Sequence, residues 1–137
     1  HFKPATMSKD VEILSQIAHR IIDGLDVEWE KLVVIIWKMG QMTMYRIHPY
    51  LNGEEGNAVV LIHDMTKLII EVHDYTTQNN YVPWNQIQLT VQNDGKLNIK
   101  YLWDQEWEDE CIQAQAEADA EEAAEKEARL QSEKESD

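Results

Sequence analysis

The sequence predicts an α+β fold: a single domain with a four-stranded antiparallel sheet, elements in the order α-β-β-α-β-β-α, and an acidic C-terminal helix. Residues 83–104, PWNQIQLTVQNDGKLNIKYLWD, contain two alternating apolar runs around Asn93-Asp94-Gly95, a strong signal for a β-hairpin. Residues 31–38 and 42–49 form two further β-type runs. Amphipathic helical patterns precede each of these two pairs of strands.

The hairpin at residues 83–104 alternates apolar and polar residues on both sides of its turn. Gly95 adopts a positive φ without a steric penalty, and Asp94 tolerates one. The face directed to the core is predicted to carry Ile87, Leu89 and Val91 from the first strand, and Leu97, Ile99, Tyr101 and Trp103 from the second. The hairpin is therefore expected to be scaffold, and it delivers the chain to Asp104.

A first helix is predicted over residues 9–23, with Ser8 as its cap and Gly24 in the left-handed conformation after its end. Asp10 and Glu12 stand in its first turn, where the helix dipole favours anions. Its buried stripe is predicted to be Val11, Leu14, Ala18, Ile21 and Ile22.

Two strands are predicted next. Residues 31–38 contain a continuous apolar run, which indicates a central strand covered on both faces. Met39-Gly40-Gln41 turns the chain into the strand at 42–49, and the segment LNGEEGN after it reads as an exposed loop.

A second helix is predicted over residues 58–77, because apolar residues recur there at steps of three and four. The stripe consists of Leu61, Met65, Leu68, Val72 and Tyr75, widened by Ile62, Ile69 and Ile70.

The negative charge of the chain is concentrated near its end. The protein has 26 acidic and 12 basic residues and a net charge of −14. From Asp104 onward there are 14 acidic and 3 basic residues, whereas residues 1–103 have 12 and 9. We predict a domain at 8–110 and an acidic, Ala/Glu-rich helical tail at 111–137. Residues 1–6 are interpreted as possible vector residue, since Met7-Ser8 looks like a natural start.

The composition disfavours several classes of protein. The single cysteine, Cys111, allows no intrachain disulfide, and its acidic neighbours should raise its thiol pKa. No apolar run approaches the ~20 residues of a membrane span, so we expect no membrane association, and the single cysteine fits a reducing cytoplasm. No basic cluster supports nucleic-acid binding. No nucleophile elbow or phosphate loop is present, so we predict no catalytic residue, no cofactor and no enzyme activity.

Two His-Asp pairs, His63-Asp64 and His73-Asp74, suggest a metal-dependent hydrolase as an alternative class. Ten residues along one predicted helix place the pairs roughly 80° apart around its axis, however, and not on one face. Surface or interface histidines explain them better, and no metal site is predicted.

Two further features have both a structural and a functional interpretation. The Ala/Glu tail is either a solvated helix that keeps the protein in solution or a polyanionic arm for a basic partner. Trp29 and Trp107 each stand between two glutamates, so each is either an ordinary packing residue or an anchor for a protein partner, rimmed by carboxylates.

The order and spacing of short motifs resemble the YezG-like family of bacterial antitoxin or immunity proteins. The motifs are Glu28-Trp29-Glu30-Lys31 after the first helix, Pro83-Trp84, Ile87 to Val91, Gly95-Lys96, and Ile99-Lys100-Tyr101-Leu102-Trp103-Asp104. The resemblance covers roughly residues 9–110. It implies a non-catalytic cytoplasmic protein that binds and neutralises a cognate toxin, commonly a nuclease domain.

A nuclease has a basic substrate-binding surface, so we expect the toxin to be bound by an acidic face. The candidate residues for that face are Glu28, Trp29, Glu30, Glu54, Glu55, Asp104, Glu106, Trp107, Glu108 and Asp109. The alternative is an acidic adaptor or secretion chaperone that binds an effector protein.

Overall fold

The computed structural model describes residues 7–61 and 63–135. The predictions for residues 1–6 and for Ile62 lie outside the described residues. The chain divides into two compact units, one ending at Trp103 and one beginning at Asp104. The helices and strands are α1 (Lys9–Gly24), β1 (Lys31–Met39), β2 (Met42–Leu51), β3 (Glu54–Glu55), α2 (Thr66–Gln78), β4 (Gln86–Gln92), β5 (Leu97–Leu102) and α3 (Gln105–Glu135).

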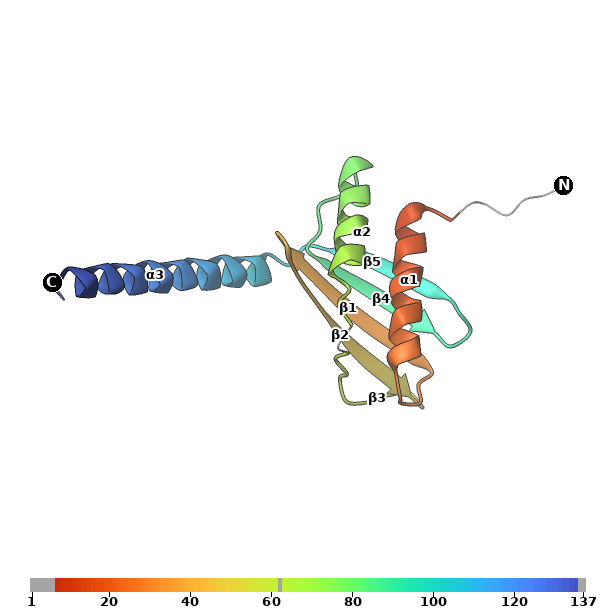
Figure 1. Ribbon diagram of the computed structural model, residues 1–137. Helices are drawn as coiled ribbons and strands as arrows, with labels where there is room; N and C mark the ends of the chain where they lie inside the picture. Colours follow the sequence, from red (N-terminus) through yellow and green to blue (C-terminus); the bar gives the residue numbers. More distant parts are fainter. Residues whose placement is uncertain (1–6, 62, 136–137) are drawn as a thin grey trace. The chain divides into compact units, whose positions relative to one another are not determined.

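The first unit is an antiparallel sheet with two helices on one of its faces (Figure 1). The strand order is β3-β2-β1-β4-β5, so β1 lies at the centre between β2 and β4. The α+β class is confirmed, but the sheet has five strands and not four. Asn52 and Gly53 have φ values of 55° and 76°, and this tight turn folds Glu54 and Glu55 back onto Tyr50 and Leu51. The predicted loop therefore contains a short edge strand.

The core lies between the helices and one face of the sheet. Alternate residues of the two central strands are buried: Leu32, Val34 and Ile36 in β1, and Ile87, Leu89 and Val91 in β4. The prediction that β1 is covered on both faces is wrong, since Val33, Ile35 and Trp37 are only half-buried. A continuous apolar run here reflects one core face and one partly exposed apolar face.

Helix α1 matches its predicted range, with two corrections. Its buried residues are Asp10, Ile13, Leu14, Ile17, Ala18 and Ile21. The predicted stripe thus missed Ile13 and Ile17, whereas Val11 and Ile22 are half-buried at its border. Gly24 is not left-handed but is the last helical residue. A Cβ there would lie 3.0 Å from Leu61 Cδ1 and His63 Nε2, so glycine allows the segment before α2 to approach closely.

Helix α2 begins eight residues later than predicted, at Thr66. The segment before it is extended: Val59 and Ile47 exchange two backbone hydrogen bonds of 2.8 and 3.1 Å. Asp64 Oδ1 then accepts a hydrogen bond from Thr66 N at 2.9 Å, which favours a helix start there. Within α2 the buried residues are Leu68, Ile69, Val72 and Thr76.

The hairpin of β4 and β5 is confirmed, with a four-residue loop at 93–96. Gly95 has a φ of 93°, while Asp94 avoids positive φ and its side chain accepts a hydrogen bond from Lys96 N at 3.0 Å. Trp103 was predicted on the core face, but β5 ends at Leu102 and Trp103 is 46% exposed. Alternation of apolar and polar residues predicts the buried face only within a strand, and Trp103 lies beyond the end of β5.

A polar cluster joins α1 to the end of β5. Tyr101 Oη donates a 2.7 Å hydrogen bond to Asp10 Oδ2, although the two residues are 91 positions apart. Trp84 packs against Tyr101, with ring centroids 5.7 Å apart, and its indole N–H donates to Thr76 Oγ1 at 2.9 Å. These contacts connect both helices with the hairpin.

The second unit is the helix α3 together with its cap. Helix α3 has 31 residues, and none of its described side chains is buried. The acidic C-terminal helix is therefore confirmed, and it begins earlier than the predicted tail. No helix in the described part of the chain is long and apolar enough to cross a membrane.

Candidate functional site

Three of the eight predicted acidic residues line one hollow of the first unit, which we call the acidic groove. Its volume is about 450 Å³. It lies where the turn between β2 and β3 meets the loop before β1. It is lined by Val27, Glu28, Pro49, Leu51, Asn52, Glu54, Glu55, Gly56, Asn57 and Val59. Three of these residues are acidic and none is basic.

The turn at Asn52-Gly53 presents two of the three carboxylates. Because its two residues have positive φ, the chain reverses within two positions and Glu54 and Glu55 lie on the outer edge of the sheet. Both are exposed. Glu55 is partly engaged, since His48 Nδ1 lies 2.9 Å from its Oε1. The Glu54 carboxylate forms no such ion pair within the described part of the chain.

Glu30 fixes the loop that carries Glu28. Its backbone N–H donates to Tyr50 O at 2.8 Å, and its carbonyl accepts from Asn93 N at 3.0 Å. Its side-chain Oε1 also accepts a 2.7 Å hydrogen bond from Asn52 N. Glu30 therefore ties the loop to β2 and to the 93–96 loop, and it holds the two sides of the groove together. Its carboxylate has a structural role next to the lining residues.

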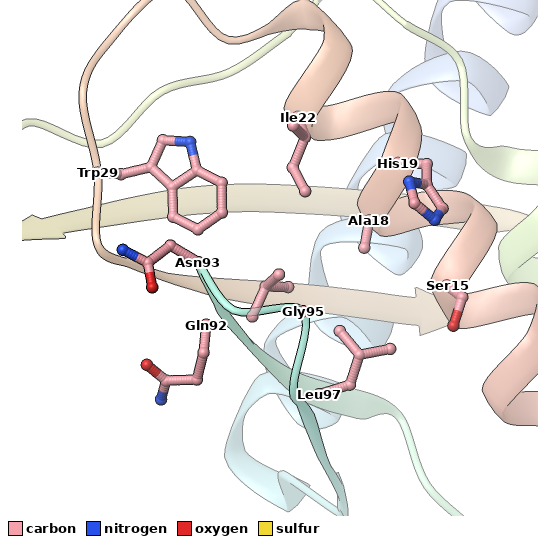
Figure 2. Close-up of a pocket in the computed structure, with 10 residues that line it drawn as sticks. Ser15, Ala18, His19, Ile22, Trp29, Gln92, Asn93, Gly95 and Leu97 are labelled. Atoms are coloured by element: carbon pink, nitrogen blue, oxygen red, sulfur yellow. The ribbon is translucent and has the colours of Figure 1, made fainter.

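Trp29 lines a different hollow, on the other side of this loop. It packs against the core and forms one wall of a half-open pocket of about 240 Å³ between α1 and the hairpin. Figure 2 shows its indole near Ile22 and Asn93, with Ala18, His19 and Leu97 around the same space. The packing interpretation of Trp29 thus has direct support, whereas its role as a partner anchor stays a prediction.

The other predicted acidic residues, Asp104, Glu106, Glu108 and Asp109, belong to the second unit. Asp104 Oδ1 accepts a 2.9 Å hydrogen bond from Trp107 N, which is helix capping. Glu106 and Glu108 stand in the first turn of α3, where the helix dipole favours carboxylates. Asp109 Oδ1 accepts from Gln105 Nε2 at 2.9 Å. The sequence EWEDE therefore also specifies a helix start.

Cys111 follows this segment, and its environment does not favour a reactive thiolate. Partial burial raises its pKa, and the carboxylates of Glu110 and Glu108 raise it further. The predicted direction of this shift is confirmed.

The two His-Asp pairs do not form a metal centre. They do not share a helix, because α2 begins after Asp64, and Asp64 instead supports the start of that helix. His73 packs edge-on against Trp84, with ring centroids 5.2 Å apart. Burial lowers the pKa of His73, and the nearby Lys38 lowers it further. Among residues 7–61 and 63–135, no three His, Cys, Asp or Glu side chains are placed to hold a metal ion.

The fold and the groove define a class of protein: a small α+β domain with an acidic hollow, partly lined by apolar side chains, at one edge of its sheet. Comparison with protein families then identifies the chain. A model described as "Immunity protein YezG-like" matches residues 44–120, more than half of the chain. The chain belongs to the YezG-like immunity protein family, as the sequence motifs indicated. No curated protein matched the chain in a sequence comparison.

The family match runs from β2 into α3. It includes Glu54 and Glu55 of the groove and the acidic start of α3. The loop with Glu28 and Glu30 lies before it. Sequence reasoning missed Val27 and Leu51, the exposed apolar residues of the groove; the only signal for them was their position in the acidic segments 25–30 and 51–57.

Proposed function

We propose that this protein binds a cognate toxin, a bacterial nuclease domain, and neutralises it through an acidic surface. Two segments are proposed to contact the toxin, each within its own unit: the acidic groove of the first unit and the acidic start of α3 in the second. The observation that carries the proposal is that Glu28, Glu54 and Glu55 line one hollow without a basic residue. A nuclease holds a polyanion, so its substrate surface is basic and complementary to such a hollow.

The exposed apolar residues that line the groove support a protein partner. Val27 is 47% exposed and Leu51 is 37% exposed, and both lie among the carboxylates. An apolar centre with a charged rim is the usual arrangement of a protein interface. Binding alone neutralises the toxin in this scheme, so no catalytic residue or cofactor of this chain takes part. The cytoplasm, where a nuclease meets nucleic acid, is the proposed place of action.

The start of α3 provides the first test. Replacing Glu106, Glu108 and Asp109 with Gln, Gln and Asn removes three charges and retains the length of each side chain. We expect toxin affinity to fall about fivefold and its salt dependence to decrease, because charges near the surface mainly accelerate association. The replacement residues are uncharged, because lysines in the first turn would interact unfavourably with the helix dipole and weaken the helix.

A matched control removes the same number of charges further along α3. Glu121, Glu122 and Glu125 are exposed, and changing all three to Gln leaves the capped end intact. Binding by both triple variants can be measured by calorimetry at low and high salt. Equal affinities for the two variants and the wild type would exclude the start of α3 from the surface.

Co-expression tests the function itself. The toxin would be the toxic C-terminal domain encoded by the gene directly upstream, and the expected result is restored growth and a co-purifying complex. An adaptor or secretion chaperone would co-purify with an effector but would not restore growth under the toxic domain. Growth arrest despite abundant folded protein would contradict the proposal.

A further inference from the structure

The sheet face opposite α1 and α2 carries a second patterned surface, which we call the open face. In antiparallel pairs, residues directly opposite each other point to the same face. The register therefore gives rows across the sheet. One row is Arg46–Ile35–Gln88–Lys100, and the next is Met44–Trp37–Gln86–Leu102. No helix of the first unit, within residues 7–61 and 63–103, covers this face (Figure 1).

The centre of the open face is apolar. Val33, Ile35 and Trp37 follow one another along β1 and are half-buried. Met42 and Met44 continue the apolar area on β2 and are 50% and 46% exposed. The adaptable methionine side chains and the indole are typical of protein-binding surfaces.

The rim of this apolar centre is basic. Arg46 on β2 and Lys100 on β5 are exposed and flank Ile35 in the same row. Three strand spacings separate them, which is about 14 Å. Lys31 lies further along β1, with its Nζ 4.5 Å from the centre of the Tyr50 ring. A chain with net charge −14 thus places three cations on one face.

Negative charge is nearly absent from the described part of this face. Glu55 is the one acidic residue that the register places there, opposite Tyr50. It is held by His48, at 2.9 Å. Glu55 also lines the acidic groove, so the two surfaces adjoin at β3.

We propose that the open face is a second binding surface for the toxin, and that it receives a part of the toxin that is apolar at its centre and acidic at its rim. This inference rests on the proposed function. The continuity at Glu55 brings a partner seated in the groove up to the open face. Opposite charge on the two surfaces fixes the orientation of the toxin, because a reversed approach sets like charges against each other.

A second copy of the chain is a poorer occupant. Face-to-face packing of two open faces would bring Arg46 and Lys100 near their counterparts, and like charges across an interface are unfavourable. A carboxylate-bearing partner instead pairs with both cations while covering Ile35 and Trp37.

The test exchanges the rim charges. We expect the double variant Arg46→Glu, Lys100→Glu to bind the toxin domain about tenfold more weakly than wild type, with the loss reduced at high salt. The control is Arg20→Glu, Lys67→Glu, which makes the same charge change at exposed positions of α1 and α2. The milder pair Arg46→Ala, Lys100→Ala should weaken binding about threefold, and it provides the test if the charge-reversed variant does not fold.

Wild-type affinity in both open-face variants, with loss of affinity in groove variants, would overturn this inference and leave the proposed function intact. No binding by the wild type would overturn the proposed function. Sedimentation of the protein alone is the remaining measurement: a dimer that dissociates in Arg46→Glu, Lys100→Glu would assign the open face to a second copy and contradict the inference.

Discussion

Exchanging Glu28 and Glu54 for lysine is expected to weaken toxin binding about 100-fold and to abolish protection in co-expressing cells. Both residues line the acidic groove, and neither carboxylate forms a hydrogen bond or ion pair within residues 7–61 and 63–135. Reversal replaces two attractions with two repulsions at the mouth of the groove. Glu55 is left unchanged because it contacts His48.

The control for the groove is the pair Glu71→Lys, Asp74→Lys, which changes the net charge equally at exposed positions beyond the first turn of α2. Calorimetry at low and high salt compares both double variants with the wild type. If only the net charge mattered, both double variants would lose the same toxin affinity. If the groove binds the toxin, only the Glu28→Lys, Glu54→Lys variant loses affinity.

Replacing Asp10 with Ala is expected to reduce the free energy of unfolding by about 2 kcal/mol. The substitution leaves the half-buried Tyr101 hydroxyl without its 2.7 Å acceptor and removes a carboxylate from the first turn of α1. Tyr101→Phe should cost a similar amount, because the buried carboxylate then loses a donor. Glu12→Ala, at an exposed position of the same turn, is the control and should cost less than about 0.5 kcal/mol. Urea unfolding measures all three, and an unchanged midpoint in Asp10→Ala would contradict this role.

The same pair makes stability depend on acidity. Burial alone would raise the pKa of Asp10, but the hydrogen bond from Tyr101 and the nearby donor groups of Ser8, Val11 and Tyr81 hold that pKa below its ordinary value of 3.8. A folded-state pKa below the unfolded one means that this contribution is complete above pH 3.8 and is lost as the pH falls through the folded-state pKa. Asp10→Asn should therefore lose less stability than the wild type when the pH is lowered through this range. The free energy of unfolding of both proteins is measured as a function of pH, and an equal fall with pH in the wild type and in Asp10→Asn would contradict this expectation.

The sequence predicted the elements whose signals are local. The β4–β5 hairpin, the turn at Gly40-Gln41 and helix α1 appear where alternation, turn residues and helical periodicity place them. The start of α2 was misplaced, because Leu61 fits a helical stripe as well as it fits an extended segment. What decides the outcome is the pairing of Val59 with Ile47, a contact between distant residues that periodicity does not register.

For the candidate site, the sequence identified the acidic residues but not their arrangement. Glu28 and Glu54 meet because a two-residue turn adds β3 to the sheet edge, and the pattern LNGEEGN was interpreted as a loop. The open face was missed for a related reason: a continuous apolar run in β1 suggested full burial, and only the pairing with Arg46 and Lys100 shows a basic rim around it.

Hydrogen–deuterium exchange of the protein with and without its toxin domain tests the central claim most directly. We predict that the complex protects backbone amides at residues 26–30 and 51–57, which form the two sides of the groove, while exchange in α2 stays unchanged. Protection confined to the helices, with both groove segments exchanging as in the free protein, would contradict the proposal that this immunity protein binds its toxin through the acidic groove.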